Sequence, residues 1–251
     1  MRLEGKAIVL TGAAGGIGTL LVRELKREGA RLVGVDRVAC PECDETILTD
    51  FSSKDGLAAL SKLLASRRVD MLVNLAGMQY FGPFERQDPG DIWTGYVVNL
   101  IAPATLIRAV LPQMQDRGDG QIVNIGSVMG AVSYPHFATY SSSKCGLRGL
   151  SEALRREIGK SHIAITYIAP RAVRTAFNGT DVNRFLEIAR MQADDPAIVA
   201  SRISRAIIGR RKEVTLGIAE HVFTRLNGLC PRIIDAGLEG TTAKARALFA
   251  N

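Results

Sequence analysis

A tyrosine and a lysine stand four residues apart in the segment YSSSK at residues 140–144. On a helix, residues i and i+4 share a face, so the Tyr140 phenol and the Lys144 ammonium can point into one cleft. A nearby ammonium favours the phenolate and lowers the tyrosine pKa toward working pH. Such a tyrosine can give a proton to a ketone oxygen or take one from an alcohol. Alone, however, the YxxxK pattern occurs by chance on many helices.

Two polar residues upstream could complete a site around this pair. Ser127 lies 13 residues before Tyr140, just past a predicted strand, where its hydroxyl could hold a substrate oxygen. Asn99 interrupts the apolar stretch VVNLI at residues 97–101. It could belong to the same site, or it could be a core amide whose hydrogen bonds are satisfied inside the fold.

A glycine-rich segment, TGAAGGIG at residues 11–18, follows a predicted strand and opens a predicted helix. Glycines let the backbone approach a pyrophosphate, and the N-terminus of the helix supplies free N–H groups and a positive dipole end. This context favours a dinucleotide-binding turn, with a tight turn rich in small residues as the alternative.

An acidic residue, Asp36, ends the second predicted strand, 18 residues after Gly18. A carboxylate there can accept hydrogen bonds from both adenosine ribose hydroxyls and would repel a 2′-phosphate, which favours NAD over NADP. Arg37 follows directly and could accommodate a phosphate, so NADP stays possible. Asp36 could also simply cap a loop.

Apolar runs alternate with helical patterns along the chain, and these elements must position the polar residues. Strands are predicted at residues 6–10, 31–36, 69–74, 121–126, 163–169 and 213–216, and helices at 17–28, 54–66 (with Ser52 or Ser53 as N-cap), 91–114 (crossed by Pro103), 140–159 and 196–208. Near-continuous apolar strands between helices predict a Rossmann-type doubly wound parallel sheet of about seven strands, with helices on both faces.

The composition bounds the class of protein. With 251 residues, of which 47% are hydrophobic, the chain fits one domain over residues 1–251 and is too apolar for disorder. No run approaches about 20 uninterrupted apolar residues, so no membrane span is expected. The first residues lack a signal-peptide pattern, so a cytoplasmic location is expected. The net charge of +7 allows anionic partners, but no basic patch interleaved with aromatic residues indicates nucleic-acid binding.

Two of the four cysteines, Cys40 and Cys43, form a CxxC. The pair could be redox-active or half of a metal site, but Cys145 and Cys230 stand alone, and the favoured interpretation is a surface loop that carries two thiols. The three histidines are not at metal-ligand spacing, and no metal is expected.

Taken together, these motifs resemble the short-chain dehydrogenase/reductase family in its single-domain form. The resemblance runs in order from residue 5 to about residue 175 and is specific as a set. It rests on TGAAGGIG (11–18), Asp36, Asp50, NLAG (74–77), Asn99, Ser127 and YSSSK (140–144).

The resemblance implies roles for four catalytic residues. Tyr140 would be the general acid/base, and Lys144 would bind the nicotinamide ribose and lower the Tyr140 pKa. Ser127 would position the substrate oxygen. Asn99 would help to hold a water that relays protons to Lys144.

The resemblance also implies a set of cofactor contacts. Asp50 would contact the adenine amino group, Phe51 the adenine ring through its backbone, and Thr175 the carboxamide or the pyrophosphate. The full set is Gly12, Ala14, Gly15, Gly16, Ile17, Gly18, Asp36, Arg37, Asp50, Phe51, Leu75, Ala76, Gly77, Tyr140, Lys144, Pro170, Val173 and Thr175.

The chain departs from the family pattern at two positions. Leu75 stands where the family usually has a second asparagine, so any cofactor contact there must come from the main chain. Arg171 replaces the glycine of the family's Pro-Gly after the fifth strand of the order above, and it could face solvent or meet an anionic substrate.

The substrate end is less informative. Residues 171–195 occupy the place of the family's substrate loop and small helix, and a C-terminal extension over residues 217–251 contains an apolar helical stretch. That extension could cover the substrate cleft, form a dimer contact or attach peripherally to a membrane.

The function implied is an NAD(P)-dependent oxidoreductase that interconverts a secondary alcohol and a ketone, on a lipophilic small molecule. Reduction of a 3-oxoacyl thioester of a carrier protein or CoA is the alternative within this class. A non-catalytic dinucleotide sensor is the alternative from a different class. The resemblance further implies a homodimer or homotetramer.

Overall fold

The computed structural model describes residues 3–249, and within that range seven strands form one sheet in which every neighbouring pair is parallel. The strands are β1 (Ala7–Thr11), β2 (Arg31–Asp36), β3 (Glu45–Leu48), β4 (Met71–Asn74), β5 (Gly120–Ile125), β6 (Ile163–Ala169) and β7 (Glu213–Thr215). Their order across the sheet is β3-β2-β1-β4-β5-β6-β7. Strands β2 and β3 are added on one side of β1 and strands β4 to β7 on the other, so the strand order reverses between β1 and β4, where a crevice opens at the carboxyl ends of the strands.

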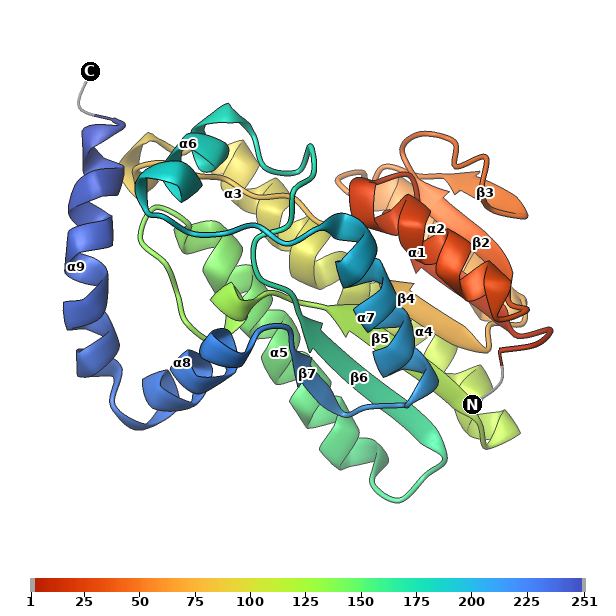
Figure 1. The fold of residues 1–251 in the computed structure, drawn as a ribbon. Helices are drawn as coiled ribbons and strands as arrows, with labels where there is room; N and C mark the ends of the chain where they lie inside the picture. The colour runs from red at the N-terminus through yellow and green to blue at the C-terminus, as the bar shows by residue number, and fades with distance from the viewer. Residues whose placement is uncertain (1–2, 250–251) are drawn as a thin grey trace.

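Helices cover both faces of the sheet (Figure 1). On one face lie α1 (Gly16–Arg27) and α7 (Pro196–Ile208), and on the other lie α2 (Lys54–Ser66), α4 (Ala102–Arg117) and α5 (Ala138–Ile158). Successive side chains of a strand point to opposite faces. Accordingly, Ile8 and Leu10 of β1 join the core cluster of α1 and α7, whereas Val9 joins the cluster of α2 and α4. The predicted doubly wound parallel sheet is confirmed.

One strand was not located by the sequence pattern. The strand β3 has four residues at the edge of the sheet, and its side chains are exposed or half-buried. It therefore shows neither a continuous apolar run nor a full alternation. The N-cap of α2 is Ser53 rather than Ser52, since its side chain accepts a hydrogen bond from the backbone N–H of Gly56 at 3.1 Å.

The helix predicted at residues 91–114 is divided into three parts. It comprises α3 (Pro89–Tyr96), a π-helical turn η2 (Val97–Ile101) and α4. Pro103 has no N–H and its ring would clash with the carbonyl four residues earlier, that of Asn99, which explains why the wider turn forms there.

By length and composition alone, the continuous helical stretch 89–117 is the one candidate membrane span in the described range. A core helix meets the same criterion, and α4 buries Leu106, Ile107 and Val110 in the cluster that it shares with α2.

The remaining helices lie around the carboxyl edge of the sheet. The short helix α6 (Thr180–Ile188) follows β6, and α8 (Ile218–Leu229) and α9 (Pro231–Ala247) follow β7. Figure 1 shows α8 and α9 beyond β7, with α9 standing beside α6. The predicted helical stretch in the C-terminal extension is thus two helices, because Pro231 begins a new one.

Candidate active site

A cavity of about 1260 Å³ lies along the carboxyl edge of the sheet. Every residue predicted to contact the cofactor lines it, and so does Ser127. Asn99 lies outside its lining. Single small-molecule sites usually have about 300–1,000 Å³, so this volume suits a dinucleotide together with a substrate.

The glycine-rich turn forms one end of the cavity. Gly12 has φ +72°, and a Cβ on it would lie 2.8 Å from the backbone nitrogen of Ala76. A Cβ on Gly16 would lie 2.8 Å from Cγ2 of Thr175. Glycine is therefore required for the turn to close against its neighbours. Because Gly15 caps α1 without a side chain, the N–H groups of the first helical turn stay available to an anion, and the turn fits a pyrophosphate.

The carboxylate of Asp36 lies beside this turn. Its Oδ2 accepts a hydrogen bond from the N–H of Ala14 at 3.0 Å, and its Oδ1 accepts one from the N–H of Arg37 at 2.7 Å. Each oxygen keeps a further lone pair for a ligand hydroxyl. Asp36 thus fastens the loop, as one interpretation held, and still lines the cavity. Nearby, Asp50 accepts hydrogen bonds from the backbone and the hydroxyl of Ser52.

The segment after β4 is held by Thr11. Its Oγ1 accepts hydrogen bonds from the N–H groups of Leu75 and Ala76, each at 3.1 Å. The side chain of Leu75 packs against the core cluster of β1 and α1. This geometry leaves the main chain of residues 75–77 to line the cavity.

Asn99 sits behind the cavity in η2, with 1% of its surface exposed. Its Oδ1 accepts from the N–H of Met78 at 3.0 Å, and its Nδ2 donates to the carbonyl of Met78 at 2.8 Å and to Oγ of Ser143 at 3.0 Å. The side chain is therefore a satisfied core amide that ties η2 to the loop after β4 and to α5. The Asn99 carbonyl lacks the usual donor four residues on, since that residue is Pro103. A water-relay role stays a prediction.

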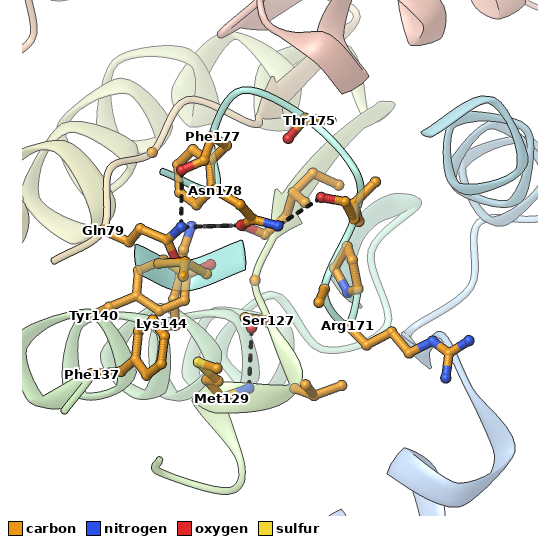
Figure 2. A pocket seen from close by; sticks show the side chains of 18 of the residues that line it. Gln79, Ser127, Met129, Phe137, Tyr140, Lys144, Arg171, Thr175, Phe177 and Asn178 are labelled. Carbon is orange, nitrogen blue, oxygen red and sulfur yellow. Dashed lines mark hydrogen bonds between the residues drawn. The ribbon is translucent and has the colours of Figure 1, made fainter. Parts of the chain in front are cut away.

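Tyr140 and Lys144 project from one face of α5 into the cavity, near Ser127 (Figure 2). Nζ of Lys144 lies 5.8 Å from the centre of the Tyr140 ring and donates to the carbonyl of Ile125 at 3.1 Å. Oγ of Ser127 accepts from the N–H of Met129 at 3.1 Å, at the start of the short helix η3 (Val128–Gly130). Three of the four residues predicted to be catalytic are thus brought to one wall of the cavity, and Asn99 lies behind it.

Burial is the main cause of the pKa shifts of Tyr140 and Lys144. It raises the pKa of Tyr140 to about 12, partly offset by a hydrogen bond with Ser127, and it lowers the pKa of Lys144 to about 8. The direction for Tyr140 is opposite to the one expected from the lysine alone, because removing a phenolate from water outweighs the nearby ammonium. At neutral pH the phenol keeps its proton and can donate it.

A polar bridge across the cavity was not foreseen from the sequence. Nε2 of Gln79, in the loop after β4, donates to the carbonyl of Phe177 at 2.9 Å and to Oδ1 of Asn178 at 3.1 Å (Figure 2). Asn178 in turn donates to the carbonyl of Val173 at 2.9 Å. The bridge holds the Phe177 ring 6.2 Å from the ring of Tyr140. The only sequence signal was the place of Gln79, two residues after NLAG.

Arg171 adopts neither of the two positions expected for it. Its guanidinium is paired with the carboxylates of Asp194 and Glu220 instead of facing solvent or a substrate anion. Two opposite charges within reach account for this orientation.

The CxxC pair is not simply a surface loop. Cys40 is buried, and its Sγ donates to the carbonyl of Ala13 at 3.4 Å, while Cys43 is half-buried. The interpretation as a surface loop is therefore wrong for Cys40. Between residues 3 and 249, no cluster of three or more His, Cys, Asp or Glu side chains is arranged to hold a metal ion.

Beyond Tyr140 the cavity is lined mainly by apolar side chains. They come from the loop after β5, the substrate loop with α6, and the helices α8 and α9. These residues are Met129, Val132, Phe137, Phe177, Val182, Leu186, Met191, Phe223, Leu226, Ile233, Ile234 and Leu238.

Comparisons with known proteins agree with this geometry. The family model described as short chain dehydrogenase matches residues 6–184. The chain is 29% identical to dehydrogenase/reductase SDR family member 7B of Danio rerio, over 86% of this chain and 78% of that protein. It is 30% identical to ketoacyl reductase HetN of Nostoc sp., over 84% and 78%. A short-chain dehydrogenase from Sphingobium yanoikuyae in complex with NADPH superposes with a TM-score of 0.78 at 26% identity, over 92% of this chain and 95% of that one.

Proposed function

This chain belongs to the short-chain dehydrogenase/reductase family and is an NAD(P)-dependent dehydrogenase/reductase, and from that premise we propose that it interconverts a secondary alcohol and a ketone with Tyr140 as general acid/base. The observation that carries the proposal is the meeting of Tyr140, Lys144 and Ser127 on one wall of a cavity whose other end is the glycine-rich turn.

In the direction of reduction, the Tyr140 hydroxyl donates its proton to the ketone oxygen as negative charge develops there. The Ser127 hydroxyl donates a hydrogen bond to the same oxygen, since its Oγ is already oriented by the N–H of Met129. The Lys144 ammonium stabilises the phenolate that remains on Tyr140. The nicotinamide dinucleotide supplies or accepts the hydride when bound. In the direction of oxidation, the same residues act in reverse.

The dinucleotide is held by this chain's own groups at the other end. The glycine-rich turn and the N-terminus of α1 would bind the pyrophosphate, and Asp36 would accept hydrogen bonds from the adenosine ribose. We propose that NAD is preferred, because a 2′-phosphate would approach the Asp36 carboxylate, while Arg37 is the group that would favour NADP.

The cofactor preference can be tested by fluorescence titration of NADH and NADPH. We expect NADH to bind more tightly, and we expect Asp36→Asn to weaken NADH binding by about 10-fold or more, the value of a lost charge-assisted hydrogen bond. The asparagine keeps one acceptor for the two backbone N–H groups, those of Ala14 and Arg37, that donate to the Asp36 carboxylate. As the control, Asp50→Asn should leave the ratio of the two affinities unchanged. Tighter binding of NADPH by the unaltered protein would contradict the preference, and Arg37→Ala would then show whether Arg37 is responsible.

We further propose that the substrate is a lipophilic small molecule. Apolar side chains from three parts of the chain line the region beyond Tyr140, and two of its charged residues, Arg171 and Glu220, are paired with each other. Reduction of a 3-oxoacyl thioester is a second candidate, supported by the similarity to ketoacyl reductase HetN.

A series of neutral aliphatic ketones of increasing chain length would separate the two candidates. We expect kcat/KM to rise two- to fourfold per methylene until the cavity is filled, because each buried CH₂ contributes about 0.8 kcal/mol. Acetoacetyl-CoA, measured alongside, should be the poorer substrate. A flat chain-length series together with efficient turnover of the thioester would favour the second candidate.

A further inference from the structure

Arg171 ties three separate segments together at the substrate end of the cavity. Arg171 lies just after β6. Its Nη2 is 2.6 Å from Oδ1 of Asp194, and its Nη1 is 3.2 Å from Oε1 of Glu220. The three side chains are 30%, 16% and 23% exposed, so the group is partly shielded from water. Figure 2 shows the guanidinium pointing away from Tyr140 and Ser127. The two carboxylates raise the pKa of Arg171, which therefore stays charged at every working pH.

The first partner, Asp194, belongs to a part of the substrate loop that is hydrogen-bonded to the segment after β6. Asp194 donates its N–H to the carbonyl of Ala172 at 2.8 Å, and its own carbonyl accepts from the N–H of Arg174 at 3.0 Å. Its backbone is thus fastened to the segment that carries Arg171. The second partner, Glu220, stands in the first turn of α8.

The helix α8 contacts α9 and the adjacent strand β7, but few of its contacts are buried. None of its side chains is buried within residues 218–229, although Phe223 and Leu226 line the cavity. Apart from the pair with Arg171 near its start, α8 is fastened near its end, where Nδ2 of Asn227 donates to the carbonyl of Ala131 at 2.8 Å. Because no side chain of α8 is buried between residues 218 and 229, these two polar contacts contribute a large share of what holds the helix in place.

We propose that Arg171 is a positioning residue that fixes α8 as a wall of the substrate end and thereby sets the affinity for the apolar part of the substrate. The part of the inference that concerns substrate affinity rests on the proposed function, but the position of α8 can be tested without a substrate. Arg171 does not act as a receptor for a substrate anion. Both of its terminal nitrogens face carboxylates, so an incoming anion would meet two negative charges and one positive charge.

The variant Arg171→Ala tests the proposal, with Arg174→Ala as its matched control. Arg174 lies on the same loop and pairs with Asp195 at 3.2 Å, but it does not touch α8. In Arg171→Ala we expect KM for a long-chain neutral ketone to rise about tenfold, with kcat and the Kd of NADH within about twofold of the unaltered values. Arg171→Lys, which keeps the charge, should restore part of the affinity. Arg174→Ala should leave KM unchanged.

Hydrogen exchange supplies a readout that needs no substrate. We expect the amides of residues 218–230 to exchange at least about tenfold faster in Arg171→Ala and unchanged in Arg174→Ala. Glu220→Gln, which spares the Arg171–Asp194 pair, should show the same change to a smaller degree and covers the case in which Arg171→Ala does not fold. Unchanged exchange in α8 would overturn the proposal, as would a fall in kcat at constant KM. Faster exchange in a protein that reduces no neutral ketone would instead contradict the proposed substrate class.

Discussion

Replacing Tyr140 with phenylalanine is expected to lower kcat for ketone reduction about 10³-fold, within the range of 10²–10⁴ for loss of a general acid. This corresponds to about 4 kcal/mol of transition-state stabilisation. The substitution removes one oxygen and keeps the ring, which packs in a cluster with Phe137 and Phe185. The hydroxyl is the group that can give a proton to the ketone oxygen, since its pKa of about 12 keeps it protonated at neutral pH. Single-turnover measurements with saturating NADH would isolate the chemical step.

The control for this variant is Tyr96→Phe. Tyr96 also contacts α5 through its hydroxyl, 2.8 Å from Oγ of Ser142, but it lies outside the cavity lining. Tyr96→Phe should keep its kcat, and Tyr140→Phe should keep its NADH affinity within about twofold. Activity above about a tenth of the original in Tyr140→Phe would contradict the assignment. Loss of NADH binding would show instead that the hydroxyl, which is also among the predicted cofactor contacts, acts mainly in holding the dinucleotide.

The elements whose bounds the sequence predicted best are two strands covered on both faces and two helices with one regular apolar face. The bounds of β2 and β6 agree with the predicted residues 31–36 and 163–169, and those of α2 and α7 agree with 54–66 and 196–208. A strand covered by helices on both faces must be apolar at nearly every position, so its run is visible without an alignment. The edge strand β3 has no such requirement, which is why its four residues carried no signal.

The shape of the helix around Asn99 depends on contacts that are distant in sequence. Pro103 indicated an irregularity, but the polar residue within the apolar stretch could be read in two ways. Its amide is matched to Met78 and Ser143, 21 and 44 residues away. Only the packing of η2 against α5 and against the loop after β4 brings these groups together.

The contacts at the substrate end also join residues distant in sequence, and they are even harder to predict from it. Arg171 pairs with residues 23 and 49 positions away, and Gln79 bonds to Asn178 at a separation of 99. No local period links such partners. The glycine-rich turn could be recognised because the requirement for glycine and the start of the helix lie within eight residues, 11–18. A ligand site formed by one turn can therefore be predicted from the sequence, whereas a wall assembled from several loops and helices cannot.

The direction of the Tyr140 pKa shift could not be predicted from the sequence pattern either. The spacing of YSSSK placed an ammonium near the phenol but carried no information on how deeply both are buried. Lys144 is 3% exposed and Tyr140 is 9% exposed. Desolvation disfavours both charged forms, so it raises the pKa of Tyr140 and lowers the pKa of Lys144. Both shifts work against a phenolate and an ammonium existing side by side at neutral pH. Because Lys144 has the lower of the two pKa values, we expect the loss of its proton to set the upper pH limit for reduction.

Replacing Lys144 with methionine is expected to lower kcat/KM for reduction about 10²- to 10³-fold, the usual loss when a charge that stabilises a transition state is removed. In the proposed mechanism the ammonium offsets the negative charge left on Tyr140, and it is the predicted contact to the nicotinamide ribose, so NADH affinity should fall as well. Lys160→Met, on the exposed turn after α5, is the control and should change neither quantity.

The charge of Lys144 also predicts the pH profile. Because burial lowers the pKa of Lys144 to about 8, the ammonium is present below this pH and is lost as the pH rises through it. Reduction should therefore fall above about pH 8, approaching tenfold per pH unit, when kcat/KM is measured from about pH 6 to about pH 10. Lys144→Arg keeps its charge over this range, so its alkaline limb should move to higher pH even if its rate is lower. A flat profile in the unaltered enzyme, or an unmoved limb in Lys144→Arg, would show that another group controls the reaction.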